Sequence, residues 1–308
     1  MVATVSRRTS VKGPGRAAAA ARSRIRSAYP HWFYLPAAVV YGALFLLPTV
    51  VSFYFALTRW TLFDQEFIGL ENFALFFAEP ALVKGLVNTV IYAVVTSGLK
   101  VLLGLPLAVL LTSNIIGRAY LRSAVFFPVL VSTIGVGITF TILMHPSQGL
   151  INDSLALLGI EGPRWLTDPS YALLSVALVD VWKGIGLATL IYIAGIAAIP
   201  PEYLEAARVD GAGRWATFRH VLLPLSRPAT VTVIILSLIG GLRSFDLIWA
   251  MTRGGPGFTS DVIASVIYKQ YQAGFYGLST AGNVVLFVLV TAIVLPLAWF
   301  LGRKEVRL

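Results

Sequence analysis

Six long apolar stretches, separated by more polar segments, dominate the pattern of hydrophobic and polar positions along the chain. A helix needs about 20 largely apolar residues to cross a hydrocarbon core about 30 Å thick, and each stretch is long enough. Because the stretches are continuous in hydrophobicity and do not alternate, they predict helices and exclude a β-barrel. The pattern predicts an all-α polytopic membrane protein with six transmembrane helices, at approximately 31–57, 86–113, 123–144, 171–197, 229–251 and 281–301.

Glycines and prolines interrupt most of these stretches. Such residues are tolerated in membrane helices where neighbouring helices satisfy the freed backbone groups, so we expect kinked helices in a bundle. They are Gly135 and Gly137 in the third stretch, Gly240 and Gly241 in the fifth, and Pro48, Pro106 and Pro296 in others.

The composition agrees with a membrane protein. Of the 308 residues, 57% are apolar and 12% are charged, and the mean hydropathy is +0.80, whereas a soluble domain has about 25% charged residues. The absence of cysteine excludes disulfides, thiolate metal sites and cysteine nucleophiles. The net charge of +10 could indicate a nucleic-acid partner, but the basic residues lie at the N-terminus and in short gaps between apolar stretches. We therefore expect no nucleic-acid partner, because this charge distribution indicates topology.

The Lys and Arg residues set the orientation. With successive loops assigned to alternate sides, sixteen basic and four acidic residues fall on the side of the N-terminus, against five basic and eight acidic residues on the other. Short cytoplasmic loops carry the excess of Lys and Arg. The sequence therefore predicts cytoplasmic termini and an external loop 58–85.

Three segments are predicted on this topology. Residues 1–30 are rich in Arg, Ser and Ala and are expected to form a disordered cytoplasmic arm near the anionic inner leaflet. Residues 31–304 form a single six-helix transmembrane domain, and residues 305–308 form a cytoplasmic tail. A cleaved signal peptide is a rival interpretation of the N-terminus, but the first apolar stretch is longer than a signal core and starts too late.

The loop 198–228, between the fourth and fifth stretches, predicts a helix–turn–helix on the cytoplasmic side. Pro200 and Pro201 suit the first turn of a helix, and Glu202 and Glu205 place negative charge near the positive end. This helix should stop at Asp210–Gly211, and a second amphipathic stretch follows at Arg214–Leu223. By composition alone, the loop is typical of an interfacial segment that joins two spans.

The spacing of particular residues within this loop resembles a known sequence motif. It is Glu205-Ala206-Ala207, three residues, Gly211, nine residues, Val221, one residue, and Leu223-Pro224. This resembles the EAA loop, Glu-Ala-Ala-x3-Gly-x9-Ile-x-Leu-Pro, of permease subunits in binding-protein-dependent ABC importers. Six positions match, and the seventh is a conservative Val for Ile.

Other segments are more specifically similar to the carbohydrate-uptake branch, on the side of the first permease (maltose F-type and glycerol-phosphate A-type). The similarity covers about 31–304, although the large inserted outer domain of the maltose protein is absent. The segments are Phe67-Ile-Gly-Leu-Glu-Asn-Phe73, Asn88-Thr89, Gly149-Leu-Ile-Asn152, Val181-Trp182-Lys183, Glu202-Tyr-Leu-Glu-Ala-Ala-Arg-Val-Asp-Gly-Ala212, Phe245-Asp246 and Thr252-Arg-Gly-Gly-Pro256.

The resemblance implies a type I ABC importer permease fold and a set of partners. These would be a second permease subunit, two cytoplasmic ATPase subunits that bind ATP and Mg, and an extracytoplasmic solute-binding protein that delivers a sugar, all at the inner membrane of a prokaryote. The chain itself would bind no cofactor. The helix at Glu202–Val209 would dock into a groove on one ATPase. The residues expected to couple ATP hydrolysis to transport are Glu202, Glu205, Ala206, Ala207, Asp210, Gly211, Leu223 and Pro224.

Nothing in the sequence indicates catalysis. It contains no Gly-x4-Gly-Lys-Ser/Thr phosphate-binding loop, so ATP hydrolysis is expected on other chains. His31, His145 and His220 lie in separate membrane-boundary regions without the spacing of metal ligands. We therefore expect no metal site and no enzyme activity in this chain.

Charged residues within apolar stretches are candidates for the solute path, because burial in a membrane is costly. Asp180 and Lys183 stand three apart on the fourth stretch, which fits an ion pair as well as a solute contact. Arg243 and Asp246 are expected in the outer half of the fifth. A sugar site also needs hydrogen-bonding groups and aromatic faces. Phe245, Trp249 and Asn283 could supply these, although packing between helices is the more ordinary role for the two aromatic rings.

Two alternatives stay open at this stage. A stand-alone secondary transporter driven by an ion gradient would also use six spans with buried charges, but it would have no reason to carry the EAA spacing. A membrane-embedded enzyme would need paired catalytic residues, which the sequence lacks.

Overall fold

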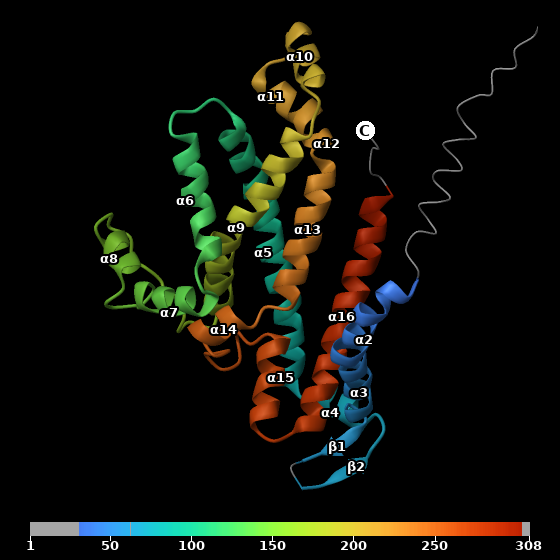
Figure 1. Ribbon diagram of the computed structural model, residues 1–308. Coiled ribbons are helices and arrows are strands. Elements are labelled where there is room, and N and C mark those ends of the chain that lie inside the picture. Colours follow the sequence, from blue (N-terminus) through green and yellow to red (C-terminus); the bar gives the residue numbers. More distant parts are fainter. Residues whose placement is uncertain (1–30, 62, 304–308) are drawn as a thin grey trace, which may run out of the picture. The chain divides into compact units, whose positions relative to one another are not determined.

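The computed structural model describes residues 31–61 and 63–303 (Figure 1). The chain divides into two units, Met1–Ser52 and Phe53–Leu308. Two predicted segments, the basic arm 1–30 and the tail 305–308, lie outside the described residues.

In the first unit, the described chain is helical throughout. The short η1 (His31–Tyr34) leads into α2 (Leu35–Tyr41), a π-helical segment η2 (Gly42–Leu46) and α3 (Leu47–Phe55), whose last residues belong to the second unit. Pro36 stands in the first turn of α2, where its missing N–H removes no intrahelical hydrogen bond. The stretch Trp32–Phe55 is apolar and long enough to cross a membrane.

The second unit is a helical bundle with a short hairpin. Its long helix α5 packs against both α9 and α13, and α16 packs against α13 and α15. In chain order the elements are β1 (Thr58–Trp60), β2 (Gln65–Phe67), α4 (Glu71–Ala78), α5 (Pro80–Thr112), α6 (Arg118–Leu130), α7 (Thr133–Leu143), α8 (Leu150–Ala156), α9 (Ala172–Ala197), α10 (Pro201–Val209), α11 (Arg214–Thr217), η3 (Phe218–Leu222), α12 (Leu223–Leu225), α13 (Arg227–Leu242), α14 (Asp246–Met251), α15 (Ile263–Gln272) and α16 (Tyr276–Gly302).

Small residues bring α5 and α13 close together. A Cβ atom on Gly241 would stand 2.7 Å from Cα of Ala93, so the two backbones meet there. One turn earlier on α13, the Ser237 hydroxyl lies 2.8 Å from that of Ser97 and forms a hydrogen bond between the helices. Close backbone approach and interhelical hydroxyl bonds are the usual contacts of membrane helices, since lipid supplies no hydrophobic force between them.

The third predicted stretch, 123–144, is bent and does not form one straight helix. α6 ends at Leu130, α7 begins at Thr133, and their axes differ by 100°. Pro128 lies in the last turn of α6 and cannot donate the backbone hydrogen bond that would continue the ladder. Val131, the C-cap of α6, is in an extended conformation and completes the break.

The fifth predicted stretch, 229–251, is interrupted as well. α13 ends at Leu242, directly after two glycines that weaken a helix, and α14 begins only at Asp246, whose charge suits a first turn. Arg243 and Asp246 therefore flank this break and do not lie on one continuous helix, and their place in the outer half of the membrane stays a prediction. A second bend, of 65°, separates the residues Arg214–Leu225 from α13.

The helices set bounds on the number of spans. In the described part of the chain, four helices are long and apolar enough to cross a membrane, and up to six spans result if each of the two bent pairs crosses as one. The bundle agrees with the predicted all-α membrane fold, and six crossings stay a prediction.

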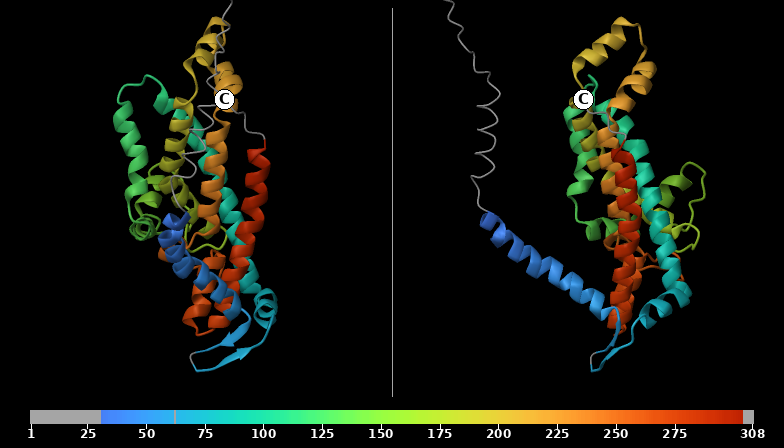
Figure 2. Two further views of the ribbon diagram at one scale, coloured as in Figure 1. Left: turned by 45° about the vertical axis from the view of Figure 1, so that its right-hand side comes forward. Right: turned by 90° about the vertical axis from the view of Figure 1, so that its right-hand side faces the viewer.

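The second unit has two opposite ends (Figures 1 and 2). At one end, which we call the α10 end, α10, α11 and α12 project beyond the bundle. At the other, the hairpin end, β1 and β2 pair antiparallel with Thr58 opposite Phe67. The first turns of α16 and the last turn of α15 lie beside this hairpin.

Candidate functional sites

The loop at the α10 end has the helix–turn–helix form that the sequence predicts. α10 ends in two hydrogen bonds of the Schellman type, from the Ala212 N–H to the Ala207 carbonyl at 2.9 Å and from the Gly211 N–H to the Arg208 carbonyl at 3.1 Å. Gly211 has φ +74°, which a residue with a Cβ rarely adopts. Asp210 is the C-cap of α10, so the sequence motif coincides with the turn that stops the helix.

Most of the predicted coupling residues face outward. Glu202, Glu205 and Ala206 are exposed, whereas Ala207 is buried, so only one of the two motif alanines packs within the chain. Neither glutamate forms an ion pair within residues 31–61 and 63–303. Leu223 and Pro224 are also exposed, on α12. The loop thus offers one carboxylate-bearing helix face that no other part of the described chain covers.

Asp180 pairs with a residue that lies far from it in the sequence. Its Oδ2 lies 2.7 Å from Nζ of Lys100, and this bridge joins α9 to α5. Lys183 makes no ion pair in the described part of the chain, so of the two roles that the spacing allowed, the ion pair with Asp180 is not formed. Side chains three apart on a helix are neighbours, but the Asp180 carboxylate pairs with Lys100 on the adjacent helix instead.

The bridge lies in a tightly packed part of the bundle. Exposed fractions of the Lys100 and Asp180 side chains are 10% and 25%. A Cβ on Gly184 would stand 2.7 Å from Cε of Lys100, so α9 passes directly over the lysine stem. The pair therefore leaves the carboxylate partly accessible, while the ammonium is enclosed.

The break between α13 and α14 holds an aromatic cluster. Phe245 stacks on Trp249 with ring centroids 5.7 Å apart, and Tyr268 from α15 packs edge-on against Trp249 at 4.9 Å. Arg243 and Asp246, on the same segment as Phe245 and Trp249, are exposed. Four of the predicted path residues thus lie at this break, and the structure adds Tyr268, which no sequence motif marks.

Asn283 has a different setting. It lies on α16, and its amide donates to the Ser279 carbonyl one turn earlier, at 3.4 Å. Its side chain is exposed. The polar group expected beside the aromatic platform is therefore bonded within its own helix.

A cluster of polar side chains joins α5 to the loop before α15, and the sequence did not indicate it as a site. The Asn88 amide donates to the carbonyls of Thr259 and Asp261 at 2.9 and 2.8 Å, and the Thr89 hydroxyl accepts from the Ile263 N–H at 2.8 Å. The fully buried Asp261 carboxylate accepts from Lys269 Nζ at 2.6 Å and from the Ser265 hydroxyl at 2.7 Å. α5 thereby fixes the loop that leads from α14 to α15.

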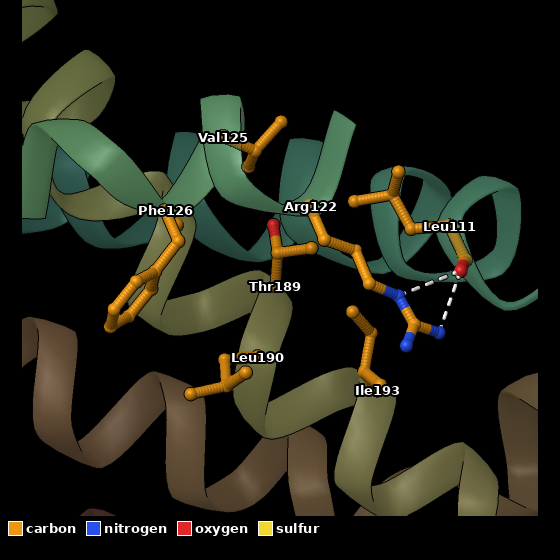
Figure 3. Close-up of a pocket in the computed structure, with 8 residues that line it drawn as sticks. Leu111, Arg122, Val125, Phe126, Thr189, Leu190 and Ile193 are labelled. Carbon is orange, nitrogen blue, oxygen red and sulfur yellow. Dashed lines mark hydrogen bonds between the residues drawn. The ribbon is translucent and has the colours of Figure 1, made fainter. Parts of the chain in front are cut away.

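A small cavity lies between α5, α6 and α9 (Figure 3). Arg122 borders it and donates from Nε and Nη2 to the Leu111 carbonyl, at 3.1 and 2.8 Å. The guanidinium therefore satisfies a carbonyl in the last turn of α5, as basic side chains do at helix C-termini. With a volume of about 70 Å³, the cavity is too small for a solute.

The apolar bundle, its internal ion pair and the exposed helix–turn–helix define a membrane transport subunit. The family described as "Binding-protein-dependent transport system inner membrane component" matches residues 74–304. The chain belongs to this family, which makes it a permease subunit of an ABC importer and not an enzyme. This membership favours the importer over the alternative of an ion-coupled carrier.

Relatives and a solved structure agree with the family. The chain is 34% identical over 258 residues to the trehalose/maltose transport system permease protein MalF of Thermococcus litoralis, covering 83% of this chain and 88% of that protein. It is 36% identical over 297 residues to the probable ABC transporter permease protein y4oQ of Sinorhizobium fredii, covering 94% and 95%. A crystal structure of a bacterial ABC transporter involved in the import of the acidic polysaccharide alginate contains a chain with 25% identity and a TM-score of 0.76, covering 95% of this chain and all of that one.

Proposed function

We propose that this permease carries a sugar or a related solute and forms one half of the membrane pathway, beside a second permease subunit. An extracytoplasmic solute-binding protein delivers the solute, and two ATPase subunits that hold ATP and Mg drive the cycle. Support for the solute class comes from the sugar transporters among the relatives. This chain binds no cofactor in the proposed scheme.

The proposed orientation places the α10 end in the cytoplasm and the hairpin end outside. Four of the basic residues assigned to the inner side lie in the loop 198–228, and acidic residues predominate in the loops assigned to the outer side. Both termini are then cytoplasmic.

The exposed face of α10 is the single observation that carries the coupling role. A helix that projects from the bundle, with a carboxylate-bearing face that no other part of the described chain covers, suits docking into a groove on an ATPase subunit. Glu205 offers its charge to a basic partner, Ala206 allows close backbone approach, and the turn at Gly211 sets the angle of the helix. Closure of the ATPase pair then moves α10 and the bundle attached to it.

For the solute path, we propose the partly accessible Asp180 carboxylate, Lys183, and the segment from Arg243 to Trp249. Charged groups and aromatic faces that lie at a helix break within the membrane region are suited to bind a hydroxyl-rich solute. Asn283 is a further candidate on α16.

Purification of the assembled complex tests the proposal. Glu205→Lys reverses the charge on the exposed face of α10, so this variant should insert normally but lose the ATPase subunits or their stimulation by loaded binding protein. Glu161→Lys makes the same charge change at an exposed position outside the loop and should behave as wild type. Normal ATPase retention and stimulated hydrolysis in Glu205→Lys would refute the coupling role.

A further inference from the structure

Three aromatic residues and a threonine line a second, larger cavity at the hairpin end. Trp60 comes from β1, Tyr271 from the last turn of α15, and Tyr276 and Thr280 from the first turns of α16. The cavity has a volume of about 330 Å³, which lies within the range of about 300–1,000 Å³ for small-molecule sites. β1 and the consecutive helices α15 and α16, about 200 residues further along the chain, therefore converge on a space of the size of a small ligand.

Packing behind the cavity holds its aromatic rings in place. Phe55 stacks on Trp60 with centroids 4.4 Å apart, and Tyr276 leans against Trp60 at 5.5 Å and against Tyr271 at 5.3 Å. Each ring thus has a neighbour that limits its movement, so the site is largely formed before a ligand arrives.

The backbone around the cavity is fixed as well. The buried Asn72 amide donates to the carbonyls of Ala56 and Thr58, at 2.9 and 2.8 Å, on either side of the start of β1. A Cβ atom on Gly277 would collide with the Thr58 carbonyl, so α16 touches β1 directly. The hairpin and α16 therefore form one continuous wall.

The lining suits an uncharged ring with many hydroxyls. The indole N–H of Trp60 and the hydroxyls of Tyr271 and Tyr276 make no hydrogen bond with the rest of the described chain, so these groups can bond to a ligand. Thr280 donates to the Tyr276 carbonyl at 2.7 Å and retains acceptor capacity. No charged side chain lines the cavity. A pyranose ring, with one apolar C–H face and a rim of hydroxyls, matches both features.

The position of the cavity connects it with the proposed solute path. Tyr271 lies three residues after Tyr268 on α15, so the two side chains are neighbours on that helix. Tyr268 in turn packs against Phe245 and Trp249. Aromatic side chains thus follow α15 from the cavity to the break between α13 and α14.

We propose that this cavity is a binding site for one neutral pyranose residue at the outer mouth of the path. The inference rests on the proposed sugar function and adds the site and the charge class of the ligand. An aromatic belt that only anchors the protein at the lipid surface is the rival explanation for exposed Trp and Tyr. An anchor depends on the total aromatic surface, whereas a binding site depends on the residues that line the cavity.

The test measures sugar binding to the complex in lipid nanodiscs, without the binding protein. The probes are the methyl α-pyranosides of glucose, galactose and mannose together with trehalose, each followed by saturation-transfer NMR. Tyr271→Ala should weaken binding of at least one probe by about tenfold, and Tyr271→Phe, which keeps the ring, should weaken it less. Phe275→Ala is the matched control, because Phe275 is exposed at the same end but does not line the cavity.

Each outcome decides between the two explanations. Binding that falls in Tyr271→Ala and stays unchanged in Phe275→Ala supports the site. No binding of any probe to the wild-type complex, no effect of Tyr271→Ala, or equal losses in both variants would overturn it. Uptake by the wild-type complex is measured in parallel, because a complex that imports sugar yet fails the binding test refutes only the site, whereas a complex that imports no sugar refutes the proposed function.

Discussion

Lys100 on α5 donates to Asp180 on α9 across 2.7 Å, and this contact is an ion pair inside segments long enough to span a membrane. Breaking a buried pair leaves one uncompensated charge, whereas neutralising both partners removes the problem. The contribution of the pair to stability can therefore be measured separately from its role in transport.

Lys100→Met and Asp180→Asn should each destabilise the solubilised complex by about 1–3 kcal/mol. Breaking a fully buried ion pair costs about 3–5 kcal/mol, and the loss here should be smaller because the Asp180 side chain is partly exposed. The double variant should recover much of this loss. Thermal unfolding of all four proteins gives the coupling energy as a double-mutant cycle. Losses that simply add would show that the two charges do not stabilise one another.

Asn88→Ala should loosen the loop between α14 and α15. The substitution removes two hydrogen bonds, one to the partly buried carbonyl of Thr259 and one to the buried carbonyl of Asp261, at a cost of about 1–3 kcal/mol. Amide hydrogen exchange at 259–263 should therefore accelerate. Asn283→Ala, which removes one bond within α16, is the control and should leave exchange in that loop unchanged.

The sequence predicts the apolar helices well, because hydrophobic runs report membrane burial directly. It does not place the bends, since Pro128 is one of several prolines and Pro106 lies within an unbroken α5. The sequence also does not reveal the ion pair between Lys100 and Asp180, because only the packing of α5 against α9 brings together two residues that are 80 positions apart.

The candidate sites show the same division. Gly211 is predictable, because a turn after α10 demands a positive φ that the motif marks with glycine. Asn72, Asn88 and Asn152 each stand in a segment similar to the carbohydrate-uptake branch, yet only the structure shows that all three amides bond to carbonyls outside helices and strands. The cavity beside Trp60 joins β1 to residues 271–280, which are about 200 residues away in the sequence, so no local pattern could indicate it.

Cysteine labelling should place the hairpin end outside. Leu75 on α4 is half exposed, so Leu75→Cys should react with an impermeant maleimide in intact cells, whereas Ser10→Cys should react only after permeabilisation. The cysteine-free parent chain gives no background. The reverse labelling pattern would invert the proposed orientation.

Asp246→Asn should alter uptake or solute preference while the complex still assembles. The carboxylate is exposed at the first turn of α14, and asparagine keeps its shape but not its charge. Asp153→Asn makes the same change at an exposed position on α8 and serves as control. Unchanged transport in Asp246→Asn would make the segment structural and would direct the search to α9 or α16.

Two glycines in the loop at the α10 end offer a matched test of coupling. An added Cβ meets nothing within 4 Å at either Gly211 or Gly213, so neither substitution causes a clash. Gly211 has φ +74°, but Gly213 has φ −66°, which any residue adopts. Gly211→Ala should therefore strain the turn by about 1–2 kcal/mol, whereas Gly213→Ala should not.

That strain acts on the angle between α10 and the bundle and not on the membrane helices. Gly211→Ala should insert at wild-type levels but lose stimulation of ATP hydrolysis by loaded binding protein, and uptake should fall with it. Gly213→Ala should keep both activities, because its backbone conformation is unaffected. The measurement is ATPase activity of the purified complex, with and without binding protein and sugar. Wild-type stimulation in Gly211→Ala would mean that the turn does not set the position of α10 in the coupled complex, and α10 would then be only an interfacial linker between two spans.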